Sequence, residues 1–196
     1  LTVLMPVYNA ERHLREAIDS VLNQTMPAFE FIIIDDGSTD SSVAIVQSYQ
    51  DPRIRFYQNA KNSGISFTLN RGIELAATNL IARMDADDIC FPNRLERQYA
   101  FIQSHPDGAL FSCWVEEITE EKEPIRVEKY LPHEYFYNLP FAFLLYHPSL
   151  VFTRDAVKSI GMYTVPYGED YELVWQLSRR FKMYHQPEVL LQYRIS

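Results

Sequence analysis

The chain has 196 residues, of which 47% are hydrophobic and 14% aromatic, enough apolar residues for a sizeable core within the size range of one domain. Its formal net charge of -8 argues against the basic surface that nucleic-acid binding requires, so no nucleic-acid partner is expected. No apolar stretch approaches the roughly 20 residues that a helix needs to cross a bilayer, so no membrane span is expected in these residues.

The cysteines and the start of the chain bear on where the protein works. Cys90 and Cys113 have no metal-ligand spacing and make no disulfide framework, which favours a reducing compartment. The sequence opens at Leu1 inside an apolar run, with neither a signal peptide nor an initiator Met. We therefore expect a fragment of a longer cytoplasmic protein, in which any membrane association is carried by regions outside the fragment.

Strand-length apolar runs alternate with amphipathic segments of helix length through the first half. In chain order, the pattern predicts a strand at 1–7, a helix at 11–23, a strand at 29–35, a helix at 40–50, a strand at 53–57, a helix at 65–77, a strand at 80–84 and a helix from Pro92 to 104. Asp40 is expected to cap its helix, and Pro92 suits a first helical position. This alternation is typical of an α/β fold with a mostly parallel sheet covered by helices.

The second half is less regular. The pattern predicts a strand at 109–118, a hairpin tip in the charged stretch 116–123, a helix at 133–146 interrupted by Pro140, a strand at 149–152, a helix at 169–181 and a strand at 189–193. No repeat or low-complexity linker divides the chain. A single domain over residues 1–196 is therefore expected.

The placement of the glycines excludes two common nucleotide-binding folds. The turn after the first strand, from Pro6 to Glu11, contains no glycine. The six glycines of the chain, at 37, 64, 72, 108, 161 and 168, cannot form G-x-G-x-x-G or a P-loop. Neither a dinucleotide-dependent dehydrogenase nor a P-loop NTPase is supported.

Three carboxylates, Asp85, Asp87 and Asp88, directly follow an apolar strand. Like charges so close repel unless a cation or a basic group offsets them. Because alternate residues of an extended segment point the same way, Asp85 and Asp87 are expected to converge on Mg²⁺ or Mn²⁺, which prefer oxygen ligands. The alternative is a solvated loop in which Asp88 caps the next helix.

Other polar residues follow strands or begin helices. Asp35 and Asp36 follow a buried strand, and Asp36 is placed to accept a hydrogen bond from a base N–H, although the residues after it suit turn and cap positions. Haloacid-type phosphatases need an Asp where Ile34 stands. Glu169 and Asp170 lie in the first turn of a helix, where capping alone could account for them.

Taken in order, these segments resemble the family 2 glycosyltransferases, inverting enzymes with the GT-A fold, and the likeness covers essentially the whole chain. The matching pieces are Met5 to Asn9, Leu14 with Ile18 to Gln24, Ile34 to Ser38, Asn62 to Gly64, Asn70 to Gly72, Met84 to Asp88, and Gly168 to Asp170. The stretch from Leu80 to Asp88, followed by Pro92 and Arg94 to Glu96, is similar to a bacterial subgroup that builds surface polysaccharides. Leu69 departs from the many members that have Arg there.

The resemblance implies a role for most of these residues. Asp85 and Asp87 would form the D-x-D metal motif, and Asp170 would be the catalytic base with Glu169 as its nearest competitor; His147 and Asp88 are weaker site candidates. The nucleotide-sugar would be bound by Pro6, Val7, Tyr8, Asn9, Glu11, Asp36, Asn62, Gly64, Asn70, Asp85, Ala86 and Asp87. Residues 1–90 would bind the donor, and residues 91–196 the acceptor.

The expected function is the transfer of a sugar from a nucleotide-sugar, expected to be a UDP-sugar, to a hydroxyl of a glycan or lipid-linked acceptor, assisted by Mn²⁺ or Mg²⁺. Two alternatives stay open. A sugar nucleotidyltransferase also needs a metal and an α/β sheet, but it normally carries a Gly-rich loop with a Lys after its first strand, which this sequence lacks. A non-catalytic nucleotide-sugar-binding module could keep Asp36 and Asp87 without needing Asp170.

Overall fold

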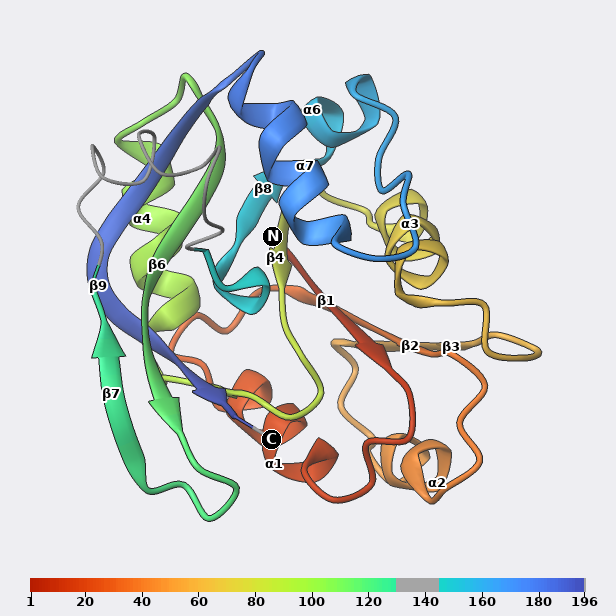
Figure 1. Ribbon diagram of the computed structural model, residues 1–196. Coiled ribbons are helices and arrows are strands. Elements are labelled where there is room, and N and C mark those ends of the chain that lie inside the picture. Colours follow the sequence, from red (N-terminus) through yellow and green to blue (C-terminus); the bar gives the residue numbers. More distant parts are fainter. Residues whose placement is uncertain (130–144, 196) are drawn as a thin grey trace.

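The computed structural model describes residues 1–129 and 145–195, which form a sheet flanked by helices (Figure 1). The strands are β1 (Thr2–Val7), β2 (Glu30–Asp35), β3 (Ile54–Gln58), β4 (Leu80–Arg83), β5 (Ile89–Cys90), β6 (Gly108–Ile118), β7 (Pro124–Glu128), β8 (Val151–Thr153) and β9 (Lys182–Arg194). The helices are α1 (Leu14–Leu22), α2 (Ser42–Gln47), α3 (Ile65–Leu75), α4 (Arg94–Gln103), α6 (Arg154–Ser159) and α7 (Glu169–Ser178), with a 3₁₀ turn η1 (His147–Ser149).

The described strands form one nine-stranded mixed sheet in the order β3-β2-β1-β4-β8-β6-β9-β5, with β7 paired to β6. The strands of the first half, β3, β2, β1 and β4, are parallel to one another. Antiparallel pairing enters with β8, which lies between β4 and β6. The α/β fold is thus confirmed, and the carboxyl ends of the four parallel strands meet at one edge of the sheet.

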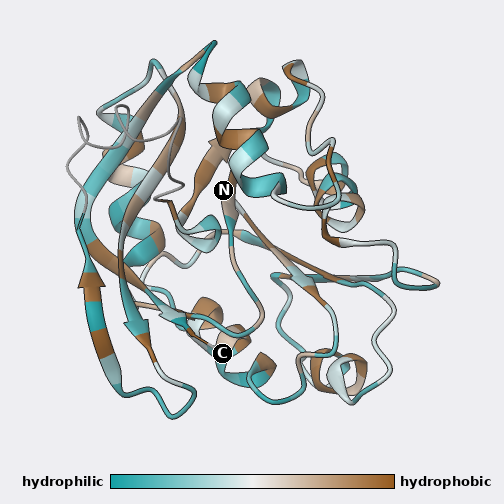
Figure 2. Ribbon diagram, viewed as in Figure 1, coloured by the Kyte–Doolittle hydropathy of each residue, from teal (hydrophilic) through white to brown (hydrophobic). Residues whose placement is uncertain are grey.

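The alternation of apolar residues along the strands builds a core on each face of the sheet. Leu4 and Ile32 belong to one cluster, whereas Met5 and Ile33, their neighbours in sequence, belong to the other. This follows from the two-residue period of a strand, which sends successive side chains to opposite faces. Figure 2 shows hydrophobic residues along the central strands and along one side of the helices.

The two clusters identify which helices cover which face (Figure 1). Helices α3, α6 and α7 pack on the face that carries Leu4, and α1, α2 and α4 pack on the face that carries Met5. In α1 the buried residues are Leu14, Ala17, Ile18 and Val21, the spacing expected for one face of a helix. No helix within residues 1–129 and 145–195 is long and apolar enough to cross a membrane.

The sequence predictions and the structure differ mainly in the second half. The helix begins at Arg94 rather than Pro92, and β5, β7 and α6 were not predicted. The last strand starts at Lys182 instead of residue 189 because β9 pairs with the long strand β6. A register shift between Cys113 and Trp114 of β6 accommodates the stretch of β9 that contains Pro187. The tip between β6 and β7 lies in the predicted charged stretch, and the helix predicted at 133–146 lies almost entirely outside the described residues.

Candidate functional site

A pocket of about 500 Å³ lies at the carboxyl edge of the parallel strands, where the loops after β1, β2 and β4 meet. Ligands of open α/β sheets dock at this edge. The pocket is lined by Pro6, Val7, Tyr8, Asn9, Ala10, Arg12, His13, Asp36, Asn62, Gly64, Ile65, Thr68, Asp85, Ala86, Asp87 and Glu120. All the residues predicted to bind the nucleotide-sugar are therefore brought together here, except Glu11 and Asn70.

The turn after β1 forms one wall of the pocket and is held by the loop after β2. Asn9 has a positive φ of 49°, a backbone region that Asn tolerates better than most residues. Its side-chain Oδ1 accepts a hydrogen bond from the backbone N–H of Thr39 at 2.8 Å, and its own N–H donates to Ser38 Oγ at 2.9 Å. Tyr8 is left 48% exposed at the pocket wall.

Glu11 and Asn70 make structural contacts away from the pocket lining. Glu11 accepts a hydrogen bond from the backbone N–H of Ser41, just before α2. The side chain of Asn70, in α3, bonds to both the backbone N–H and the backbone carbonyl of Tyr163. These contacts place the two residues in support of the loops, and their role in substrate binding stays a prediction.

Asp36 is buried in the pocket wall with its carboxylate fixed by three donors. Oδ1 accepts from Asn59 Nδ2 at 2.6 Å and from the Ser63 N–H at 3.0 Å, and Oδ2 accepts from the Gly64 N–H at 2.9 Å. A carboxylate oxygen has two lone pairs. Oδ2 therefore keeps one acceptor position for a ligand. The bonds from Ser63 and Gly64 to Asp36 hold their loop against the end of β2.

Asp35 and Gly37 form the turn that aims Asp36 at the pocket. Asp35 Oδ2 accepts the N–H groups of Gly37 and Ser38, each at 3.1 Å. Gly37 has a φ of 75°, and a Cβ there would lie 2.6 Å from the carbonyl carbon of Lys61. Only glycine satisfies both the backbone conformation and this close approach.

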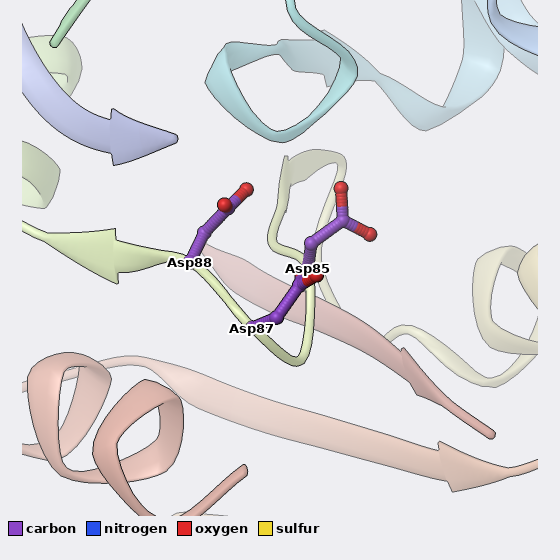
Figure 3. A group of neighbouring side chains, drawn as sticks. All are labelled: Asp85, Asp87 and Asp88. Atoms are coloured by element: carbon purple, nitrogen blue, oxygen red, sulfur yellow. The ribbon is translucent and has the colours of Figure 1, made fainter. Parts of the chain in front are cut away.

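Asp85, Asp87 and Asp88 arise from the turn between β4 and β5 (Figure 3). Each offers an oxygen within 4.8 Å of the others'. Burial raises the pKa of Asp87, and the charge of Asp85 raises it further. Burial, followed by the charges of Asp85 and Asp87, holds the pKa of Asp88 well above its ordinary value. Both shifts disfavour the ionised carboxylates, so a cation bound beside them would stabilise their charged forms.

Asp88 does not cap a helix, because β5 follows it. It is 1% exposed, and its Oδ1 accepts the backbone N–H of Arg194 at 2.8 Å. Its Oδ2 is buried and has no hydrogen-bond partner among residues 1–129 and 145–195. The solvated-loop alternative is thus wrong for Asp88. Asp85 forms an ion pair with Arg83, whose side chain is 4% exposed.

Arg194 holds the Asp turn against the rest of the protein. Its side chain is 1% exposed. Nε donates to the Asp87 carbonyl at 2.8 Å, Nη1 donates to the Glu120 carbonyl at 2.6 Å, and Nη2 pairs with Glu16 at 2.9 Å. The end of β9 therefore joins the Asp turn, the β6–β7 hairpin tip and α1.

Replacing Arg194 with Met is expected to lower the free energy of unfolding by about 3 kcal/mol, because buried acceptors lose charge-assisted hydrogen bonds. Urea denaturation followed by circular dichroism measures the change. Arg180→Met is the control, since Arg180 is exposed and makes one long bond, of 3.3 Å, to Ser159. Equal losses in the two variants would contradict the role given to Arg194.

The first turn of α7 lies beside the buried His147. Glu169 Oε1 lies 3.9 Å from His147 Nδ1, and His147 Nε2 lies 2.7 Å from the Tyr163 hydroxyl. Burial and the charge of Arg83 hold the pKa of His147 well below its usual range. His147 is therefore neutral, and its approach to Glu169 is not an ion pair. This places His147 in a buried hydrogen-bond network.

Glu169 and Asp170 differ in their surroundings. Burial raises the pKa of Glu169, with smaller contributions from the charges of Asp170 and Asp85, so Glu169 lies within electrostatic reach of the Asp cluster. Asp170 Oδ1 accepts the N–H of Tyr171 at 2.7 Å. Neither residue lines the pocket, and which of them is the base stays a prediction.

Several pocket residues were missed in the sequence, namely Ala10, Arg12, His13, Ile65, Thr68 and Glu120. Arg12 and His13 directly follow the turn that was singled out but were assigned to the predicted helix at 11–23, which begins only at Leu14. Glu120 comes from the hairpin tip, more than 80 residues after Asp36 in the chain. Only the tertiary fold brings Glu120 to the pocket.

Named relatives of the chain are glycosyltransferases. It is 31% identical to an uncharacterized glycosyltransferase of Haemophilus influenzae, over the whole chain and 65% of that protein. It is 32% identical to the O-antigen biosynthesis glycosyltransferase WbnJ of Escherichia coli, over the whole chain and 79% of that protein. With the amylovoran biosynthesis glycosyltransferase AmsE of Erwinia amylovora it shares 33% identity, over 98% of the chain and 75% of that protein.

Solved structures agree in fold at lower identity. The whole chain matches 58% of Staphylococcus aureus TarS 1-349 in complex with UDP-GlcNAc, with a TM-score of 0.81 and 19% identity. Over 98% of its length, the chain also matches 56% of the mannosyltransferase PcManGT of Pyrobaculum calidifontis in complex with GDP-Man and Mn²⁺, with a TM-score of 0.75 and 19% identity. These matches support the GT-A fold. The chain thus spans under two thirds of these structures and of the Haemophilus relative. Residues 2–163 match the model of glycosyl transferase family 2, and the chain belongs to this family.

Proposed function

We propose that this chain transfers a sugar from a nucleotide-sugar, a UDP-sugar, to a hydroxyl of a glycan or lipid-linked acceptor, with inversion at the sugar carbon. The observation that carries the proposal is the pocket, which joins the β1 turn, Asp36 and the Asp85–Asp87 turn at the carboxyl edge of the parallel strands. Relatives named for O-antigen and amylovoran biosynthesis support a surface polysaccharide as the product. Residues 1–90 would supply most of the donor site.

A divalent cation, Mn²⁺ or Mg²⁺, fits the Asp turn. The donor set is all oxygen, and one oxygen of each of the three carboxylates lies within 4.8 Å of the others. Within the part of the chain that the structure describes, the buried Asp88 Oδ2 has no hydrogen-bond partner. Asp85 and Asp87 would hold the ion, which when bound offsets the charge of the leaving diphosphate. A GDP-Man and Mn²⁺ complex of a structural neighbour supports this assignment.

The residues of the chain would act on the attacking acceptor hydroxyl and on the leaving diphosphate. The acceptor oxygen attacks the donor C1, the bond from C1 to the diphosphate oxygen breaks, and the nucleoside diphosphate leaves on the opposite side. Asp170 takes the proton of the acceptor hydroxyl. Residues 91–196, which include α7, would shape the acceptor site.

Binding of a panel of UDP-, GDP- and dTDP-sugars in the presence of Mn²⁺ tests the proposal. We expect a UDP-sugar to bind and to release UDP when an acceptor glycan is added. Release of pyrophosphate from a nucleoside triphosphate and a sugar phosphate would indicate a nucleotidyltransferase instead. Binding with no turnover on any acceptor would indicate a non-catalytic binding module.

Replacing Asp36 with Ala is expected to weaken nucleotide binding by about 1 to 3 kcal/mol, because the base loses a charge-assisted hydrogen bond. Calorimetry with UDP and Mn²⁺ measures the loss, and the metal dependence should survive. Asn59→Ala is the matched control, since Asn59 contacts Asp36 but does not line the pocket. If the control loses as much affinity as Asp36→Ala, the effect comes from the loop and the contact with the base is not supported.

A further inference from the structure

The charges that line the pocket are unevenly distributed. Asp36, Asp85, Asp87 and Glu120 are acidic, and among the described lining residues only Arg12 and His13 can carry positive charge. A nucleoside diphosphate is itself an anion of roughly two to three charges, and an anion enters such a pocket only with cationic partners. Besides a metal ion, Arg12 and His13 are the partners that the lining offers.

Helix α3, on the opposite wall, adds no cation to the lining. Leu69 is 0% exposed and packs in the core. Arg71 donates from Nη1 to the Gln58 carbonyl at 2.9 Å and to Asn59 Oδ1 at 2.5 Å, and it does not line the pocket. The loop before α1 is therefore where a diphosphate would find its protein cations.

Arg12 and His13 converge on one carboxylate oxygen. Glu120 Oε2 lies 2.8 Å from Arg12 Nη1 and 2.7 Å from His13 Nε2. The Arg12 guanidinium and the His13 ring nitrogen are thus already arranged around an oxygen anion at the pocket wall, at the distances that a phosphate oxygen would require.

The side chain of Glu120 can leave this position without moving the hairpin. Its backbone carbonyl is held by Arg194 at 2.6 Å, and the next-but-one residue, Lys122, forms an ion pair with Glu16. The side chains of Glu120 and Arg12 are 27% and 64% exposed, so water can replace their mutual contact at low cost.

We propose that Arg12 and His13 form the wall that binds the donor's diphosphate, and that Glu120 occupies this wall until a donor displaces it. The inference rests on the proposed nucleotide-sugar site and specifies its phosphate contacts. Glu120 then competes with the donor, so removing its charge strengthens donor binding, whereas removing the charge of Arg12 weakens it. A purely structural ion pair predicts no such opposite effects.

Calorimetry with UDP and with uridine, both in Mn²⁺, tests the proposal on four variants. Arg12→Gln is expected to weaken UDP binding about 10-fold, the size of one charge-assisted hydrogen bond, and to leave uridine binding unchanged. Glu120→Gln is expected to tighten UDP binding several-fold. The charge-matched controls are Arg15→Gln and Glu123→Gln, which remove exposed charges on α1 and on the same hairpin tip but outside the pocket lining.

Two results would overturn the inference: Arg12→Gln and Arg15→Gln weakening UDP binding equally, or Glu120→Gln weakening it. If the wild-type chain binds no nucleoside diphosphate, the proposed function fails. Binding of magnesium pyrophosphate to the wild type and to Arg12→Gln then still decides whether this wall binds phosphates, and equal affinities would reject it. Thermal unfolding of each variant by circular dichroism confirms that all are folded.

Discussion

Replacing Asp87 with Ala will abolish the metal-dependent binding of a nucleoside diphosphate, with an expected loss of affinity of about 100-fold or more. The side chain lies at the centre of an acidic cluster whose oxygens converge within 4.8 Å. Burial and the charge of Asp85 raise the pKa of Asp87, so a bound cation would stabilise its ionised form. A diphosphate, also negative, would be repelled without one.

Calorimetry of UDP binding with Mn²⁺ and with EDTA measures the effect. The wild type should bind only with the metal, and Asp87→Ala should bind weakly in both conditions. Asp155→Ala serves as the control, since the Asp155 side chain is 74% exposed on α6. Equal affinity of the wild type in Mn²⁺ and EDTA, together with normal binding by Asp87→Ala, would remove the metal assignment.

Replacing Asp170 with Asn is expected to lower kcat by roughly 10² to 10⁴ while donor affinity stays near that of the wild type. Inversion requires one direct displacement, so a residue across the sugar from the metal must take the acceptor's proton. Asp170, at the start of α7, comes from a different part of the chain than the Asp turn. The Tyr171 N–H, which donates to Asp170 Oδ1 at 2.7 Å, orients the carboxyl group.

Glu169→Gln is the matched comparison, because the two carboxylates are adjacent in the first turn of α7. Adjacent residues of a helix point in different directions, so we expect only one of them to reach the hydroxyl. Glu169 lies beside the neutral His147. Steady-state kinetics with UDP-sugar and acceptor decide between them: an active Asp170→Asn with an inactive Glu169→Gln reverses the roles, and two active variants place the base elsewhere.

The sequence alone predicted the α/β fold and most of the pocket lining. In a parallel sheet, the residues that follow each strand lie at the same edge of the sheet. Tyr8, Asp36 and Asp87 each follow a predicted strand, so the sequence could group them at one site. The resemblance to family 2 added the other predicted lining residues, namely Pro6, Val7, Asn62, Gly64 and Ala86. The match of residues 2–163 to the family model confirmed the resemblance.

Only the tertiary structure decided which of these residues support the site and which face it. Glu11 and Asn70 were both predicted to bind the nucleotide-sugar, but their side chains bond to backbone groups of Ser41 and Tyr163. Asp88 is buried, and its Oδ1 accepts a hydrogen bond from the backbone N–H of Arg194. Local sequence cannot reveal such contacts, because the partners lie on other elements and the register between those elements sets the contact.

The longest-range contacts were also the least predictable. The strand β9 was predicted too short because its polar start, Lys182 to Glu188, lacks an apolar pattern; pairing with β6 stabilises it nonetheless. The same pairing carries Arg194 to the Asp turn and, through the hairpin, Glu120 to Arg12. The motifs of a loop indicate which kind of ligand it can bind. Which charged side chains meet across the pocket depends instead on the register between strands that are distant in the sequence, and local sequence patterns do not determine that register.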